Sequence, residues 1–188
     1  MENSLELTDH RPIRIARQAA LCVFFALLVA IGGYLRIPIP GTPVPLTLQV
    51  VFVLLAGSFL APSAALASMA LFVTLGLAGA PVYAGGGAGL AYLTGPSGGY
   101  LLGFILGAFV CALILRGHRD RIGRVILAMS AGLLVIHVLG AAHLGLYLGG
   151  DLSAAIRLGI VPFLPGDVLK IAAASAFVAG SAAIGPRR

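Results

Sequence analysis

The stretch YAGGGAGLAYLTGPSGGYLLGF, Tyr83 to Phe104, carries no charge and is crowded with glycine. Seven glycines and two prolines lie within residues 81–99, so this segment cannot form a stable membrane-spanning helix. Apolar runs flank it on both sides, and non-helical backbone at membrane depth is tolerated only where protein covers it or where it lines a cavity. The segment is therefore predicted to be either a tightly packed hairpin or a loop that caps a cavity.

The composition of the whole chain is typical of an integral membrane protein. Of the 188 residues, 60% are hydrophobic and only 10% are charged. Several apolar runs approach the roughly 20 residues that cross a bilayer as a helix, and a water-soluble fold of this size could not bury that much apolar surface. The net charge of +6 does not indicate nucleic-acid binding, because the arginines lie between apolar runs and not along one face.

A single all-α membrane domain with six transmembrane helices is expected over residues 16–184. A polar N-terminal tail, residues 1–15, precedes it, and a short basic tail, residues 185–188, follows it. Residues 151–160 are expected to form a short amphipathic helix at the membrane interface. The predicted spans are Ala16–Leu35, Leu46–Leu60, Pro62–Ala80, Tyr100–Leu115, Val125–Leu148 and Asp167–Ile184.

The distribution of arginines predicts how these spans are oriented. Nine arginines fall near the two termini and in the connection between the fourth and fifth spans, whereas only Arg36 and Arg157 fall on the other side. We therefore expect a multi-pass membrane protein with cytoplasmic termini. The three connections rich in glycine or proline, residues 36–45, 81–99 and 149–166, are then expected to meet at the outer face.

Asp167 and Lys170, in the stretch PGDVLK, are the strongest candidate site residues. They are three positions apart and share a face at the start of the last span. Lys170 is the only lysine in the chain, and Asp167 is the only acid in or at the edge of a predicted span. An ionisable group in a membrane is a functional candidate by default. A helix-capping Asp167 and a Lys170 that reaches outward to the interface would explain the same pattern.

Other candidate ligand contacts are polar or aromatic. Gln49 can bond to a ureide or amide, or to a neighbouring helix, and Thr47 shares this ambiguity. Tyr83, Tyr92 and Tyr100 flank the glycines and are equally expected as interface anchors or ligand contacts. The backbone of the glycine-rich segment can also approach a ligand closely. The candidates there are Gly85, Gly86, Gly87, Gly95, Pro96, Gly98 and Gly99.

Enzyme chemistry is not indicated by any motif in the sequence. It contains no GxxxxGK[ST] phosphate loop, no HExxH and no GxSxG. His137 and His143 are six positions apart and do not share a helix face, so no metal site is expected. No cofactor is expected either, and Cys22 and Cys111 are expected to be inert thiols in apolar segments.

Three segments, taken together and in order, resemble one known family. PVPLTLQVVFVLLAGSFLAP, LAGAPVYAGGGAGLAYLTGPSGGYLLGF and GIVPFLPGDVLK closely resemble the BioY family, the biotin-specific substrate-binding components of energy-coupling-factor transporters. The resemblance covers about residues 16–184. It implies six helices, an extracytoplasmic biotin pocket roofed by loops, and docking to a transmembrane partner subunit that works with two ATPases. The GDxxK element of the family falls on Gly166, Asp167 and Lys170.

This resemblance assigns expected roles to the candidate residues. Biotin would be the transported ligand, with Asp167 and the amide of Gln49 serving its ureido N–H and C=O groups. Lys170 would hold Asp167 in place or meet a ligand oxygen. His143 departs from the pattern, because an aromatic or apolar residue is expected at its position.

The sequence also offers candidate residues for docking the partner subunit, and one alternative for the source of energy. Small residues allow helices to approach closely, and two pairs on the first span are candidates for docking: Ala16 with Ala20, and Ala26 with Ala30. The alternative to an importer subunit is a stand-alone secondary transporter that uses Asp167 as a proton-linked carboxylate.

Overall fold

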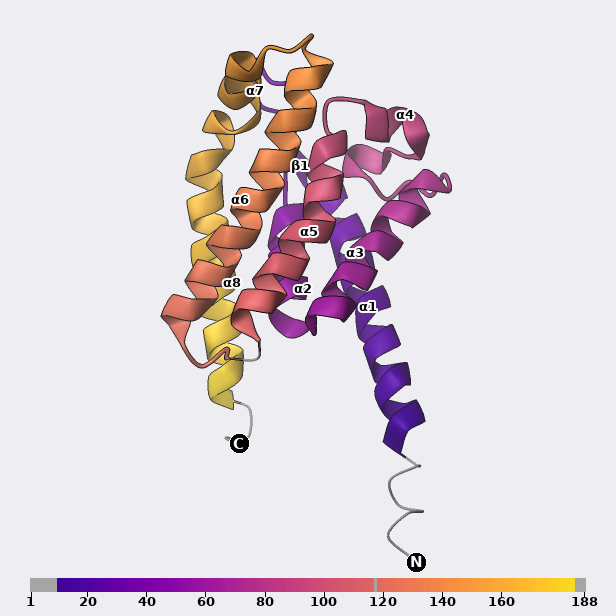
Figure 1. The fold of residues 1–188 in the computed structure, drawn as a ribbon, viewed down its shortest axis with the longest axis vertical. Helices are drawn as coiled ribbons and strands as arrows, with labels where there is room; N and C mark the ends of the chain where they lie inside the picture. Colours follow the sequence, from indigo (N-terminus) through magenta and orange to yellow (C-terminus); the bar gives the residue numbers. More distant parts are fainter. Residues whose placement is uncertain (1–9, 117, 185–188) are drawn as a thin grey trace, which may run out of the picture.

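The computed structural model describes residues 10–116 and 118–184 (Figure 1). Nearly all of this part of the chain is helical, with one short antiparallel strand pair. The elements in chain order are α1 His10–Tyr34, β1 Arg36–Ile37, β2 Leu46–Thr47, α2 Gln49–Phe59, α3 Pro62–Leu77, η2 Ala84–Gly86, α4 Gly89–Thr94, α5 Gly98–Leu115, α6 Ile122–Tyr147, α7 Leu152–Gly159, η3 Val161–Phe163 and α8 Leu164–Ile184.

Four helical stretches in the described residues are long and apolar enough to cross a membrane. They are Ile15–Tyr34, Gly98–Leu115, Ile122–Tyr147 and Leu152–Ala182. The last of these takes in α7, η3 and α8. Helices α2 and α3 are also apolar but shorter, with 11 and 16 residues. The expected all-α membrane class is confirmed at the level of these four candidate spans.

The N-terminal boundary of the first helix differs from the prediction. Helix α1 begins at His10, so residues 10–15 of the predicted polar tail are helical, while the candidate membrane span within α1, Ile15–Tyr34, is close to the predicted Ala16–Leu35. The polar residues there form the first turns of a helix that continues into the apolar run. Residues 1–9 and the tail 185–188 lie outside the described residues.

The second helix also begins later than expected, at Gln49 and not at Leu46. Four prolines in residues 38–45 hold the chain extended. Leu46 and Thr47 stay extended as well and pair with β1, in the register Arg36 with Thr47 and Ile37 with Leu46. Leu46 and Thr47, which were predicted to start a membrane helix, are therefore one strand of a small hairpin.

The last helix begins three residues earlier than expected, at Leu164. Pro165 fits there because the first turn of a helix requires no intrahelical N–H donor. The short amphipathic helix predicted over residues 151–160 is present as α7, and the Asp151 side chain caps it by accepting from Ala154 N over 2.8 Å.

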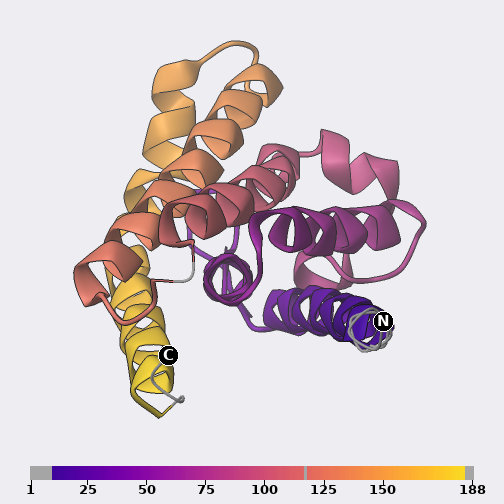
Figure 2. The ribbon, with the colours of Figure 1, turned by 60° about the horizontal axis from the view of Figure 1, so that its bottom comes forward.

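Helix α5 occupies the middle of the bundle and packs against α6, α2 and α3 (Figures 1 and 2). Helix α1 lies against α3 and α2 on one side, and α8 lies against α6 and α2 on the other. Helices α5 and α6 touch through small residues. A Cβ added to Gly107 would lie 2.7 Å from the carbonyl oxygen of Gly132, and the reverse holds as well. Glycine at both positions therefore permits this close crossing.

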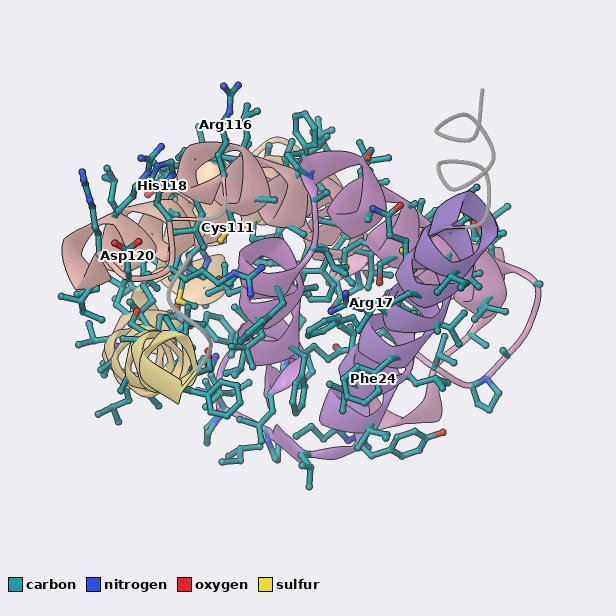
Figure 3. The ribbon with its side chains drawn as sticks, turned by 90° about the horizontal axis from the view of Figure 1, so that it is seen from below. Arg17, Phe24, Cys111, Arg116, His118 and Asp120 are labelled. Atoms are coloured by element: carbon teal, nitrogen blue, oxygen red, sulfur yellow. The ribbon has the colours of Figure 1, made fainter. Side chains whose placement is uncertain are left out.

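The two ends of the bundle differ in character. The elements of the three connections, with β1, α4 and α7, lie toward the end away from the termini (Figure 1). Arg17, Arg116, His118 and Asp120 lie at the opposite end (Figure 3). The three segments predicted to meet do so, and the charged loop between α5 and α6 is far from them.

Candidate functional site

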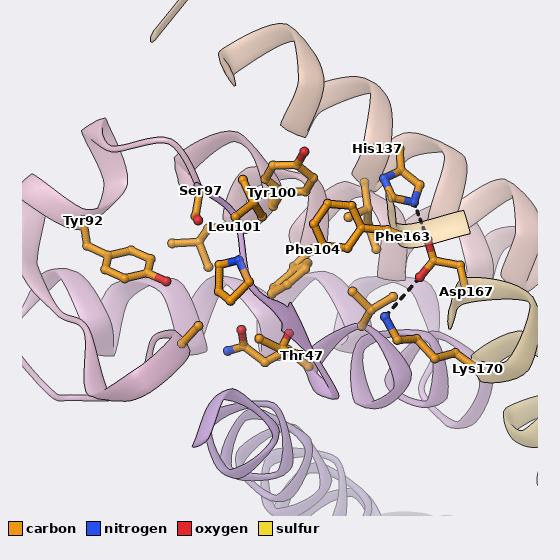
Figure 4. A pocket seen from close by; sticks show the side chains of 16 residues that line it. Thr47, Tyr92, Ser97, Tyr100, Leu101, Phe104, His137, Phe163, Asp167 and Lys170 are labelled. Atoms are coloured by element: carbon orange, nitrogen blue, oxygen red, sulfur yellow. Dashed lines mark hydrogen bonds and ion pairs between the residues drawn. The ribbon is translucent and has the colours of Figure 1, made fainter. Parts of the chain in front are cut away.

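A cavity lies where the three connections cover the ends of α2, α5, α6 and α8 (Figure 4). Apolar and aromatic side chains form most of its wall, and a few polar groups interrupt it, which is the usual design of a small-molecule site. The lining residues are Val44, Pro45, Thr47, Gln49, Val50, Ala84, Tyr92, Ser97, Tyr100, Leu101, Phe104, Ile136, His137, Phe163, Asp167 and Lys170.

This cavity is narrow, with a free volume of about 50 Å³. Two wider hollows, of about 270 and 520 Å³, lie near the turn between α2 and α3. The described residues that line them include arginines but no carboxylate and no histidine. The narrow cavity contains a buried acid with two nitrogen partners, and it therefore has the chemistry of a specific site.

Asp167 is the central polar residue of the cavity and is only 3% exposed. Lys170 Nζ donates to its Oδ1 over 3.1 Å, and His137 Nε2 lies 2.7 Å from its Oδ2. A carboxylate buried without partners would be strongly destabilising, so these two nitrogens offset the loss of its hydration. The predicted pairing of Asp167 with Lys170 is present in the structure.

The alternative explanation of this pair, as a cap and an outward-reaching lysine, does not fit the geometry. Helix α8 begins at Leu164, so Asp167 lies inside the first turn and not at the capping position. The Lys170 side chain is 10% exposed and points toward Asp167 instead of reaching to the interface (Figure 4).

His137 is the site residue that sequence reasoning missed. The prediction compared His137 only with His143 on the same helix, whereas its partner Asp167 is 30 positions away on α8. Spacing along one helix cannot reveal a contact between two helices. A usable signal was nevertheless present, because His137 is an ionisable residue within an otherwise apolar span.

Gln49 and Thr47 lie on the wall formed by α2 and β2, and both are buried. Among the described residues Gln49 Nε2 has no hydrogen-bond partner, and a Cβ added to Gly33 on α1 would lie 2.9 Å from it. Tyr100 contributes its ring from α5, and its hydroxyl donates to the carbonyl oxygen of Gly159 over 2.7 Å. That hydrogen bond fixes the ring beside the cavity.

The glycine-rich segment contributes fewer lining residues than expected. Tyr92, together with Ala84 and Ser97, lines the cavity. Burial raises the pKa of the Tyr92 phenol, so it stays a protonated donor at neutral pH. Tyr83 does not line the cavity; it is fully buried, and its hydroxyl donates to Val73 O over 2.7 Å. The structure therefore places Tyr83 as an anchor of this segment.

The seven candidate positions formed by the glycines and Pro96 are not among the lining residues. At Gly98 and Gly99 an added Cβ would collide with backbone oxygens, those of Leu93 and Leu139. Gly85 and Gly86 have φ of +70° and +79°, which residues with side chains rarely adopt. An added Cβ at Gly87 would meet the Tyr92 ring. Close packing at Gly87, Gly98 and Gly99 and the left-handed backbone at Gly85 and Gly86 thus account for these five glycines without a ligand.

The two candidate docking pairs on α1 have different environments. Ala16 and Ala20 are exposed. Ala26 and Ala30 are only 2% and 8% exposed and belong to the core of the bundle. The docking prediction for Ala26 and Ala30 is corrected accordingly, because these side chains face neighbouring helices of the same chain.

His143, unexpected from the resemblance, has a defined partner. Its Nε2 lies 3.0 Å from the carbonyl oxygen of Gly95, so it ties α6 to the glycine-rich segment. It is not among the residues that line the cavity.

The fold and the site together define a small helical membrane protein with a buried, ligand-type cavity at one end. The comparisons with known proteins agree with this class. The model of the BioY family matches residues 1–187, and the chain belongs to that family.

Two relatives and one solved structure illustrate what the chain is similar to. The chain is 38% identical to a biotin transporter BioY of Thermotoga maritima, over 85% of this chain and 92% of that one. It is 36% identical to a probable biotin transporter BioY of Pyrococcus horikoshii over the same shares. A crystal structure of the S-component for biotin from an ECF-type ABC transporter superposes with a TM-score of 0.83 at 27% identity, covering 92% of this chain and 94% of that one.

Proposed function

We propose that this chain is the biotin-capturing membrane subunit of an uptake transporter of the energy-coupling-factor type. The observation that carries the proposal is the buried Asp167, held by Lys170 and His137 on the wall of a cavity that three connections cover. The names of the relatives and the fold of the biotin S-component support the same ligand. Biotin combines an apolar bicycle with a ureido group and a carboxylate, and this wall combines aromatic surface with a few polar groups.

In this proposal each polar group of the wall has a role toward the ligand. Asp167 accepts from a ureido N–H, and the amide of Gln49 serves the ureido carbonyl. Lys170 keeps the carboxylate oriented by its 3.1 Å hydrogen bond. The rings of Tyr100, Phe104 and Phe163, which line the cavity, cover the bicycle.

Biotin is larger than the free volume of about 50 Å³, so its entry requires the lining to move apart. The segment that contributes Ala84, Tyr92 and Ser97 is the natural part to move. It is a connection between helices, and its core anchor is Tyr83.

The same proposal includes the arrangement in the membrane. Helices α1, α2, α3, α5, α6 and α8 act as six transmembrane helices, with α2 and α3 as the short ones. The arginine-rich end faces the cytoplasm of the bacterial cell, and the cavity opens outward. The exposed Ala16 and Ala20 on α1 form the docking site for the energy-coupling transmembrane subunit and its ATPases.

Binding titrations on purified variants test the assignment. Asp167→Asn and Lys170→Ala are each expected to weaken biotin binding about ten- to hundredfold, because a hydrogen bond to a charged group is worth about 1.5–3 kcal/mol. Asp151→Asn is the matched control, since Asp151 caps α7 and does not line the cavity. Near wild-type affinity in both cavity variants would remove the assignment, and mass spectrometry of co-purified biotin tests the ligand itself.

A further inference from the structure

A recess at the arginine-rich end of the bundle has no role in the proposed function. It lies at the turn between α2 and α3, where the two hollows of about 270 and 520 Å³ adjoin, since Leu60 and Ala61 line both. Together the two hollows form the turn recess. Helices α2 and α3 have only 11 and 16 residues, whereas α1 has 25 and extends well past the turn (Figure 1). The short pair therefore leaves space at this end of the bundle.

The wall of the turn recess combines arginines with apolar side chains. Arg17 on α1 lines the smaller hollow, and Arg116 and Arg119, which follow α5, line the larger one. Asp120 is at this end as well (Figure 3) but lines neither hollow. Most of the other lining residues are apolar. Positive charge beside apolar surface, at the end of a membrane bundle, suits an anionic group that carries hydrocarbon.

Arg119 is held in place by the end of α2. Its Nη2 donates to the carbonyl oxygen of Phe59 over 3.2 Å, and its guanidinium carbon lies 5.0 Å from the centroid of the Phe59 ring. The hydrogen bond uses only one of the N–H donors of the guanidinium. Its Nε is buried and has no hydrogen-bond partner among the described residues. Capping α2 therefore leaves donors of a fixed, planar cation free for an oxyanion such as phosphate.

The start of α3 contributes further positive charge to the turn recess. Pro62 is the first residue of this helix, and Ala61 before it makes no side-chain cap. Pro62 lines the larger hollow and Ala64, in the first turn, lines the smaller one. The first N–H groups of a helix lack intrahelical partners and form its positive end. This end of α3 favours the same kind of ligand as the arginines.

We propose that the turn recess binds the headgroup of an anionic phospholipid. The lipid phosphate lies against Arg119, and Arg17 adds its charge from the adjoining hollow. The acyl chains leave along the apolar wall, which a free phosphate would not use. The proposal is independent of the proposed function, because the turn recess and the cavity around Asp167 lie at opposite ends of the bundle.

Native mass spectrometry of the full chain in detergent tests the proposal. Phosphatidylglycerol and phosphatidylcholine with identical acyl chains are titrated against the wild type, Arg119→Gln, Arg17→Gln and Arg124→Gln. Arg124 is the matched control. Its Nε also donates to a helix carbonyl at this end, that of Ile114 over 2.8 Å, but Arg124 lines neither hollow.

The wild type is expected to bind its first phosphatidylglycerol about tenfold more tightly than phosphatidylcholine, the usual effect of a hydrogen bond between charged groups. Arg119→Gln should reduce this preference to less than about threefold, and Arg17→Gln should reduce it by at least about twofold, since its charge acts from farther away. Arg124→Gln should keep the wild-type preference. Biotin binding should be unchanged in all three variants.

Three results would overturn the proposal. Equal binding of the two lipids by the wild type would show that the turn recess does not select an anion. A loss of preference in Arg124→Gln as large as in Arg119→Gln would show that overall charge, and not this recess, attracts the lipid. Displacement of the lipid by glycerol phosphate, which has the headgroup charge without acyl chains, would identify a free phosphate as the occupant. If Arg119→Gln does not fold, Arg17→Gln takes its place, and an unchanged preference in that variant would be contrary.

Discussion

At the scale of single residues, Gly99 shows why this chain has so much glycine near its cavity. A Cβ added at Gly99 would lie 2.4 Å from the carbonyl oxygen of Leu139 and 2.3 Å from the Cβ of His143. Both atoms belong to α6, whose backbone cannot give way without moving the whole helix. The glycine is therefore required by the close crossing of α5 and α6.

Gly99→Ala is expected to destabilise the protein by about 1–3 kcal/mol, the usual effect of overpacking a well-packed interface. Thermal unfolding in detergent, followed by loss of monodisperse protein, measures the change. Gly180→Ala is the control, because a Cβ at Gly180 on α8 would meet nothing within 4 Å. That control should be neutral or slightly stabilising, since alanine favours a helix interior. Equal stability of Gly99→Ala and wild type would contradict the packing role.

Some of the site residues could be predicted from the sequence, and others could not. Asp167 and Lys170 were predictable because each is chemically unusual in its span and the two share one helix face. The contact of His137 with Asp167 was not, because it depends on how α6 and α8 are placed beside each other. The glycines were correctly identified as unusual, but the sequence could not distinguish packing against a helix from packing against a ligand.

At the scale of elements, the connection between α3 and α5 covers the cavity and is anchored in the core by Tyr83. Tyr83 is fully buried, and Gly76 leaves room for its ring, since a Cβ there would overlap the ring. Beyond this anchor, Tyr92 and Ser97 face the cavity. An element attached in this way can tilt at its cavity side while its anchor stays in the core.

Hydrogen exchange is therefore expected to slow in residues 84–97 when biotin binds, because the cover closes over the ligand and its backbone opens less often. Mass spectrometry of the protein with and without biotin measures this. Peptides from the first half of α6, at the arginine-rich end, serve as the internal control and should not change. Unchanged exchange in residues 84–97 at saturating biotin would show that this segment is not the moving part.

The element boundaries show where local pattern is a poor guide. Hydropathy alone extends the second span back to Leu46, but the prolines before it keep the chain extended, and the pairing with β1 retains Leu46 and Thr47 in a strand. The start of α8 at Leu164 depends on Pro165 being tolerated in a first turn. In both places proline was the decisive residue, because it keeps the connection before Leu46 extended but is tolerated in the first turn of α8.

At the scale of the whole molecule, the asymmetry of charge predicts the orientation in the membrane. Two exposed serines in the first turns of helices lie at opposite ends, Ser63 on α3 and Ser153 on α7. Introduced as single cysteines in a background with Cys22→Ala and Cys111→Ala, they form a matched pair. Ser153→Cys is expected to react with a membrane-impermeant maleimide in intact spheroplasts, and Ser63→Cys only after lysis. The opposite pattern would place the cavity on the cytoplasmic side.

The whole molecule also bears on whether this chain could drive biotin uptake by itself. A stand-alone proton-linked transporter would need Asp167 to gain and lose a proton in each cycle. In the structure both oxygens of Asp167 are engaged by nitrogen partners, Lys170 and His137, so protonation of either oxygen would disturb one of these contacts. No phosphate-binding loop is present in the sequence either. We therefore expect the chain to bind its ligand without driving uphill transport by itself.

Proteoliposomes that contain only this chain are accordingly expected to bind biotin without accumulating it, whether or not a pH gradient is imposed. Radiolabelled biotin retained on filters measures this, with retention not exceeding about one ligand per chain. Vesicles containing Asp167→Asn provide the control for binding, since their retention should fall while the vesicles stay intact. Accumulation above that level, abolished by an uncoupler, would establish the proton-linked alternative instead, because uptake coupled to the proton gradient needs no partner ATPase.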